Sequence, residues 1–85
     1  MDDIIEFDVG NLNTLCTMEA RISDEKECER AAKELGLEFN SVQWPSAPGG
    51  CFVYEFQIPG TVKFNRIKKV GLKKENTKPI CRRSN

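Results

Sequence analysis

No histidine occurs among the 85 residues of this sequence. Without imidazole, the Ser/His/Asp and Cys/His arrangements of nucleophilic catalysis are excluded. The sequence also lacks a Cys-x-x-Cys pair for thiol redox chemistry, a glycine-rich phosphate loop after a strand, and an acidic cluster with the spacing of a calcium loop. These absences predict that the protein is not an enzyme.

A signal peptide and a membrane-spanning run are also missing from the sequence. Residues 1–10, MDDIIEFDVG, contain neither the basic n-region nor the apolar h-region of a leader. No run approaches the ~18 apolar residues that cross a bilayer, so we expect a chain that does not span a membrane. If its cysteines are paired, we expect a mature or excised piece of a longer protein, in which Met1 is either native or an added start.

The sequence has four cysteines, and they are widely spaced. No two are close enough to form the Cys-x2-4-Cys knuckle of a structural zinc site, and we expect neither a metal nor another cofactor. A single domain of residues 1–85 buries only a thin core, and an even number of cysteines in so small a chain favours a disulfide framework. A cytosolic domain with reduced cysteines is the alternative. The disulfide interpretation places the protein in an oxidising compartment: the extracellular space, the secretory pathway or an organelle lumen.

Residues 23–36, SDEKECERAAKELG, carry the signals of one helix. Ser23 or Asp24 can cap its beginning, acidic residues crowd its first turn, and Gly36 is a natural stop. A narrow stripe recurs at the i, i+3, i+4, i+7 spacing of one buried face: Cys28, Ala31, Ala32 and Leu35. Because alanine is small, this helix can lie close to a sheet, where the cysteine of the stripe can meet a cysteine of a strand.

Extended segments account for the rest of the expected structure. Apolar and polar residues alternate best in CFVYEFQI, residues 51–58, and in TVKFNRI, residues 61–67. Pro59 and Gly60 turn the chain between them, which predicts a hairpin with a loop of more than two residues. Further candidates for extended chain are residues 4–9, 14–22 and 37–44. The predicted fold class is α+β, with one helix packed on a small antiparallel sheet and disulfides as staples.

Charge is divided unevenly along the chain, although its net charge is zero. Residues 1–62 contain twelve acidic and four basic side chains, whereas residues 63–85 contain nine basic side chains and one acidic one. We expect the two parts to attract each other within the fold; a basic tail that binds nucleic acid, anionic glycan or lipid is the alternative. No aromatic residue is interleaved with the lysines of residues 68–74, so nucleic acid is not favoured. The lysines that would contact such a partner are Lys68, Lys69, Lys73 and Lys74.

Aromatic residues flank a loop rich in proline and glycine. Trp44, Tyr54 and this loop, PSAPGG at residues 45–50, can form a platform for a sugar or a peptide. Burial in the core is the commoner fate of such aromatic side chains, so the platform is the alternative interpretation.

Four short motifs in a fixed order resemble a known type of domain. They are ECERAAKELG at residues 27–36, PGGC at 48–51, VKFN at 62–65 and PICR at 79–82. The order is similar to that of a small cysteine-containing domain found, often in tandem, in secreted or lumenal proteins of algae and other protists. The resemblance covers about residues 16–82, except that residues 68–78 are richer in lysine than the pattern. It implies a non-cytosolic compartment and places Cys28, Cys51, Cys81 and, less directly, Cys16 at the cysteine positions of the domain.

Among the three pairings open to four cysteines, we expect Cys28 with Cys51 and Cys16 with Cys81. The first bridge would pin the helix to the central strand, and the second would tie the tail to the beginning of the domain. In the chain-entropy model they contribute about 3 and about 4 kcal/mol. The spacing of the cysteines is compatible with all three connectivities, so this pairing is an expectation.

The expected function is that of a non-enzymatic binding or recognition module with a protein or glycan partner. The tandem occurrence of the similar domain implies that this module is one copy of a unit repeated in a longer protein. One alternative is an accessory subunit docked on a larger assembly, such as a lumenal photosynthetic or cell-surface complex. A further alternative is electrostatic binding of a polyanion by the basic C-terminal segment.

Overall fold

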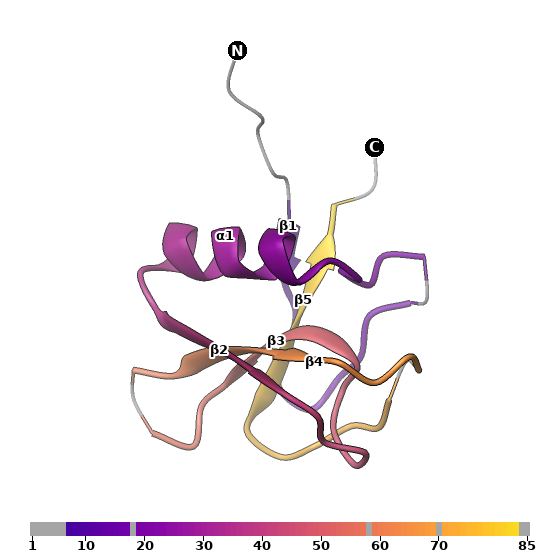
Figure 1. The fold of residues 1–85 in the computed structure, drawn as a ribbon. Coiled ribbons are helices and arrows are strands. Elements are labelled where there is room, and N and C mark those ends of the chain that lie inside the picture. Colours follow the sequence, from indigo (N-terminus) through magenta and orange to yellow (C-terminus); the bar gives the residue numbers. More distant parts are fainter. Residues whose placement is uncertain (1–6, 18, 58, 70, 84–85) are drawn as a thin grey trace.

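The computed structural model describes residues 7–17, 19–57, 59–69 and 71–83. One helix lies across one face of a sheet, and loops connect the strands beyond its other face (Figure 1). The predicted α+β class with a disulfide-stapled helix and sheet is therefore confirmed. The elements are β1 (Phe7–Val9), α1 (Glu25–Leu35), β2 (Glu38–Val42), β3 (Gly50–Tyr54), β4 (Thr61–Asn65) and β5 (Thr77–Arg82).

Helix α1 begins and ends where its capping residues predict. The Asp24 side chain accepts a hydrogen bond from the backbone nitrogen of Lys26 at 3.1 Å, which satisfies one of the free donors of the first turn. Gly36 adopts a left-handed conformation with φ of 69°, and its N–H group bonds to carbonyl oxygens of the last turn. Local sequence alone therefore defines both ends of this helix.

The sheet is mixed, whereas the sequence predicted an antiparallel one. Its strand order is β1-β5-β3-β4-β2, and all neighbours are antiparallel except β2 and β4, which run parallel. After β2, residues 43–49 carry the chain past the end of β4, so that β3 starts on the far side of β4. The hairpin between β3 and β4 then returns β4 beside β2 in the same direction. This crossing has no local sequence signature.

Asn65 at the end of β4 holds the crossing loop. Its side chain is fully buried, and its amide nitrogen donates to the carbonyl oxygens of Trp44 at 2.8 Å and Pro48 at 2.9 Å. Its amide oxygen accepts from the backbone nitrogen of Trp44 at 2.8 Å. The same loop bridges Pro48 to Gly71, which joins it to the loop before β5. One asparagine thus supplies the hydrogen-bond partners that a loop outside the sheet lacks.

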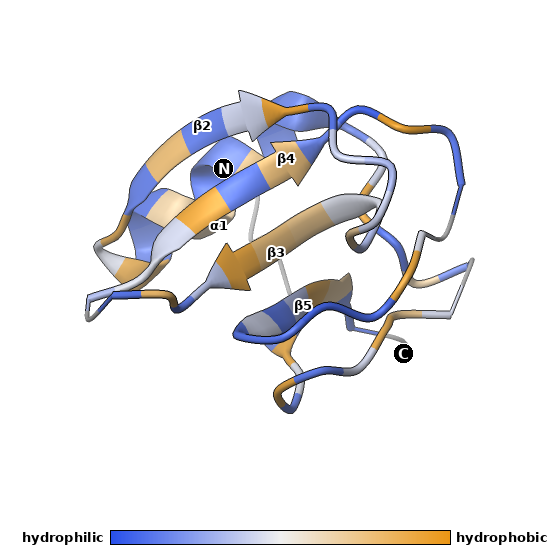
Figure 2. Ribbon diagram, turned by 90° about the horizontal axis from the view of Figure 1, so that it is seen from below, coloured by the Kyte–Doolittle hydropathy of each residue, from blue (hydrophilic) through white to orange (hydrophobic). Residues whose placement is uncertain are grey.

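The main core lies between α1 and the sheet, and Figure 2 shows apolar residues concentrated along β3 and at alternate positions of β4. Leu35 is 38% exposed, so the predicted helical stripe is wrong at its last position. Leu37 and Phe39, which follow the helix, pack against the core instead because the chain turns back at Gly36. The buried members of this core are Ile22, Cys28, Ala31, Ala32, Cys51, Val53, Val62, Phe64 and Ile80.

Some predicted strands are shorter than expected. Strand β3 ends at Tyr54, and residues 55–57 leave the sheet before the turn into β4. The described residues of segment 14–22 form no strand, and Arg21 makes an isolated antiparallel bridge with Cys81. Of the predicted segment 4–9, only β1 lies within the described residues. The hairpin with a long loop is confirmed, since residues 55–60 separate β3 from β4.

Both expected disulfides are present in the structure. Cys28 of α1 bonds to Cys51 of β3 with 5.4 Å between their Cα atoms, and this bridge is buried in the core. Cys16, before the helix, bonds to Cys81 of β5 with a Cα separation of 5.7 Å, and both residues are half-buried. The alanines beside Cys28 leave room for the close approach that the first bridge requires.

Basic residues of the last quarter of the chain pair with acidic residues that precede them, as expected for two parts of opposite charge. The Arg82 guanidinium makes two hydrogen bonds to Glu27, at 3.0 and 2.6 Å, and this contact raises the pKa of Arg82 above its ordinary value. Such surface ion pairs each contribute little to the free energy of unfolding, but they neutralise part of the positive charge of residues 63–85. The paired residues are Arg66 with Glu25, Lys78 with Glu55, Arg82 with Glu27, and Arg83 with Asp8.

Candidate functional site: an aromatic face on the open side of the sheet

Strand register brings aromatic and polar side chains together on the side of the sheet away from α1. Residues directly opposite each other in an antiparallel pair share a face, and Phe52 lies opposite Lys63 while Tyr54 lies opposite Thr61. The neighbouring positions, Cys51 and Val53, point toward the helix and fill the core. Alternation along β3 therefore leaves Tyr54 on the face that the helix does not cover.

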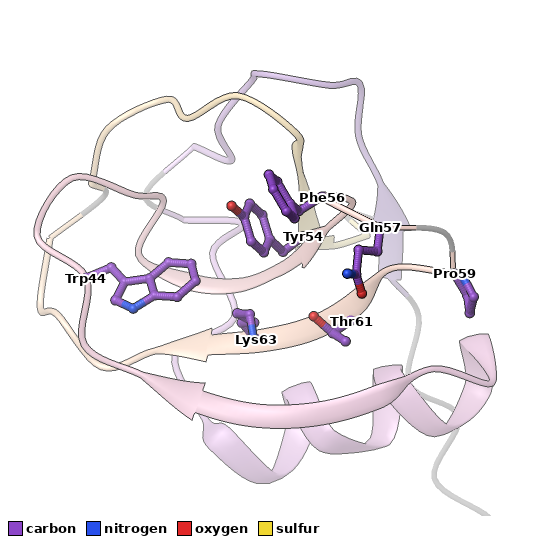
Figure 3. A pocket seen from close by; sticks show the side chains of 7 residues that line it. All are labelled: Trp44, Tyr54, Phe56, Gln57, Pro59, Thr61 and Lys63. Atoms are coloured by element: carbon purple, nitrogen blue, oxygen red, sulfur yellow. The ribbon is translucent and has the colours of Figure 1, made fainter.

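Four rings lie on this side, and one of them, the fully buried Phe52, contacts Trp44 with ring centroids 6.1 Å apart. The other three, of Trp44, Tyr54 and Phe56, are called the aromatic face below (Figure 3). The rings of Trp44 and Tyr54 meet edge to face, with centroids 5.5 Å apart. The rings of Tyr54 and Phe56 are stacked, with centroids 6.0 Å apart. Both distances lie in the range of favourable aromatic pairs. Phe56 is nevertheless 70% exposed, so the group is open to solvent at that end.

Lys63 of β4 holds its ammonium group above the aromatic face. Its Nζ lies 5.5 Å from the centroid of the Trp44 ring, within reach of a cation–π attraction. The same Nζ donates to the amide oxygen of Asn40 on β2 at 2.9 Å. A lysine ammonium has three donors, so donors remain for a ligand after Asn40 has taken one.

Two shallow depressions lie on either side of the Trp44 and Tyr54 pair, which contributes to both. The first has a volume of about 360 Å³, and the second has a volume of about 370 Å³. The first is drawn in Figure 3 and is lined by Trp44, Tyr54, Phe56, Gln57, Pro59, Thr61 and Lys63. The second is lined by Trp44, Pro45, Ser46, Tyr54 and Lys74. Rings, hydroxyl groups, an amide and ammonium groups thus surround a pair of open hollows.

The structure brings together some of the residues that the sequence singled out. Trp44 and Tyr54 are half-buried on the open face and are not members of the main core, which the sequence had made the commoner expectation. Part of the proline and glycine loop joins them, and so does Lys74. The other three lysines are exposed and line neither depression: Lys68, Lys69 and Lys73.

Sequence reasoning missed five members of the site. Phe56, Gln57, Pro59, Thr61 and Lys63 were not named as binding residues, although alternation along β4 carried a signal for Thr61 and Lys63. Pairing the polar positions of β4 with the aromatic positions of β3 requires the register of the hairpin. A turn of two residues would have fixed that register, but the long loop between the strands does not.

Within the described ranges, no group of three or more Cys, Asp or Glu side chains is arranged to hold a metal ion. In the same part of the chain, no helix has the length and apolar character needed to cross a membrane. The side chains of the aromatic face offer ring stacking, cation contact and hydrogen bonding.

No protein-family model matches this sequence, and no curated protein or solved structure matches it either. The resemblance to the small cysteine-containing domain of secreted or lumenal proteins stays a prediction. The interpretation of the site rests on the geometry of this chain.

Proposed function

We propose that this chain is a non-enzymatic binding module of an oxidising compartment, and that the aromatic face is its recognition surface. The observation that carries the proposal is the gathering of Trp44, Tyr54 and Phe56 outside the main core, with Phe56 70% exposed. Large apolar side chains grouped at a surface are a hallmark of contact sites, whereas single exposed ones are ordinary.

The scaffold suits a recognition role because it holds this surface in place. The Cys28–Cys51 bridge fixes β3, which carries Tyr54, and Asn65 fixes the loop that carries Trp44. A surface that is already ordered before binding loses less conformational entropy when a ligand arrives. The disulfides also support a location outside the cytosol, where such bonds persist.

Polyanion binding by the basic C-terminal segment has less support. Arg66, Lys78, Arg82 and Arg83 of this segment are engaged in ion pairs within the fold. Lys68, Lys69 and Lys73 are exposed and line neither depression of the aromatic face. Electrostatic attraction alone would then have to supply the affinity, and salt screens such attraction strongly.

A paired substitution tests the proposal. The protein is screened against an array of neutral glycans, acidic glycans and peptides, as the wild type and as Phe56→Ala and Leu72→Ala. Phe56 and Leu72 are both exposed, at 70% and 57%, so neither change should disturb folding. We expect a retained ligand whose binding is weakened by Phe56→Ala and unchanged by Leu72→Ala. Equal binding by both variants, or no retained ligand in any class, would contradict the aromatic face as a recognition surface.

The compartment is tested separately by intact mass of the native material, with and without reductant and alkylation. We expect no free thiol before reduction and four alkylated cysteines after it. Four alkylated cysteines in the native, unreduced protein would contradict an oxidising compartment.

A further inference from the structure

The two depressions of the aromatic face share a charge property. Each contains one lysine, Lys63 in the first and Lys74 in the second, and none of the described residues that line them is acidic. The carboxylate that follows Tyr54, Glu55, is engaged by Lys78 at 3.3 Å. Glu38 lies opposite Thr61 at the outer strand β2, but it lines neither depression. The chain thus offers positive charge on both sides of the central rings.

Neighbouring groups hold the ammonium of Lys63 and the backbone of Lys74. The Lys63 ammonium contacts Asn40 and the ring of Trp44, and these contacts reduce the ordering cost that a flexible lysine otherwise incurs on binding an anion. At Lys74 it is the backbone that is fixed, because the hydroxyl of the fully buried Thr77 donates to the carbonyl oxygen of Lys74 at 2.6 Å.

The backbone around the site favours one class of ligand over another. Strands β3 and β4 are interior to the sheet, so their N–H and C=O groups are paired with strands on both sides. An extended peptide that joins a sheet needs a free edge, which this face does not present. A ligand here meets side chains only: ring surfaces, the Thr61 and Ser46 hydroxyls, the Gln57 amide and two ammonium groups. Sugar rings with negatively charged substituents match this set.

We propose that the aromatic face binds an acidic glycan. One sugar ring rests on the ridge formed by Trp44 and Tyr54, and negative substituents on either side enter the two depressions at Lys63 and Lys74. This inference rests on the proposed function and adds the chemical class of the ligand. Carboxylate and sulfate groups share the chemistry that the lysines recognise, and the probes distinguish between them.

The test uses the whole chain and four probes of matched length in calorimetric titrations: an oligogalacturonide, a heparin-derived oligosaccharide, a neutral cello-oligosaccharide and an oligoglutamate peptide. We expect at least one acidic glycan to bind tighter than the neutral one, and its affinity to fall as salt rises. Lys63→Met and Lys74→Met should each weaken that binding about tenfold to a hundredfold, which corresponds to the loss of one charged hydrogen bond. Lys73→Met is the matched control, because Lys73 is exposed beside Lys74 and lines neither depression. Its affinity should be unchanged.

Each other outcome overturns a definite part of the inference. The indole resonance of Trp44 is followed by NMR in the same titrations. If the neutral oligosaccharide binds as tightly as the acidic ones and shifts this resonance, the charge argument is wrong while the recognition surface stands. If Lys73→Met weakens acidic glycans as much as Lys74→Met does, the basic loop and not the aromatic face is the binding site. If the oligoglutamate peptide binds as tightly as the glycans, the glycan class is wrong. If no probe shifts the Trp44 resonance, the inference is overturned, and the array with Phe56→Ala decides the proposed function independently.

Discussion

Asn65 and Trp44 exchange two hydrogen bonds, each 2.8 Å long, between the side-chain amide of the first and the backbone of the second. Asn65 is fully buried at the end of β4, whereas Trp44 belongs to a loop and forms the ridge of the aromatic face. The fold and the candidate site therefore meet at this pair. A change that breaks it should affect stability and the position of the tryptophan together.

Asn65→Ala removes three hydrogen bonds and leaves the backbone groups of the loop without partners. We expect the free energy of unfolding to fall by about 3 kcal/mol, since several unsatisfied buried groups each cost energy. Urea titration measures the loss, and the tryptophan fluorescence of the folded variant should shift to longer wavelength as Trp44 becomes more exposed. Asn11→Ala is the control, because Asn11 is exposed and should change stability by less than about 0.5 kcal/mol. Equal effects of the two substitutions would show that the buried amide is dispensable.

The two disulfides should be reduced in a fixed order. Cys16 and Cys81 are half-buried, whereas Cys28 and Cys51 are 0% and 1% exposed. Thiol–disulfide exchange requires access of a thiolate to a sulfur atom, so a mild dithiol reductant should open Cys16–Cys81 first. Timed alkylation followed by peptide mass analysis detects the order. Prior or simultaneous alkylation of Cys28 under native conditions would show that the helix leaves the sheet readily.

Removing either bridge by a pair of alanine substitutions should destabilise the domain by several kcal/mol. The bridges span 65 and 23 residues, and the chain-entropy model assigns about 4 kcal/mol to Cys16–Cys81 and about 3 kcal/mol to Cys28–Cys51. Cys28→Ala with Cys51→Ala also deletes two sulfur atoms from the core, which adds a packing loss and can make the two costs similar. Thermal unfolding of both variants against the wild type measures the costs. A variant that melts with the wild type would mean that the bridge contributes no stability.

Substitution of two glycines distinguishes the cost of an unfavourable backbone conformation from the cost of a steric collision. Gly71 and Gly36 both have positive φ, of 86° and 69°. A Cβ atom at Gly71 would collide with the carbonyl oxygen of Ala47 in the neighbouring loop, whereas at Gly36 nothing lies within 4 Å. We expect Gly36→Ala to cost about 1 kcal/mol, from conformation alone.

Gly71→Ala should cost about 1–3 kcal/mol more than Gly36→Ala, because the loop must move to relieve the collision. Chemical denaturation of the pair measures the difference. The same shift would displace the loop that carries Trp44, so Gly71→Ala should also perturb the indole resonance. Equal stability of the two variants would show that the loops before β3 and β5 are not held together in solution.

Local chemistry allowed several elements to be predicted from the sequence. Helix α1 was predicted to within its caps because Asp24 and Gly36 act through bonds within their own turns. The faces of β3 and β4 followed from alternation, and small alanines beside Cys28 indicated close contact with a strand. These features depend on neighbours in the chain, which a sequence displays directly.

The parallel pairing of β2 with β4, the role of Asn65 and the membership of the aromatic face depended on contacts between distant residues. Nothing beside Asn65 in the chain reveals that a loop some twenty residues earlier will need its amide, and nothing beside Lys63 reveals that Trp44 will lie under its ammonium group. The amino-acid sequence by itself determined the helix, the two faces of the hairpin and the supply of cysteines. Tertiary structure alone decided which side of the sheet the helix covers, and so which aromatic rings stay open to a ligand, because that choice is made by packing between elements rather than within them.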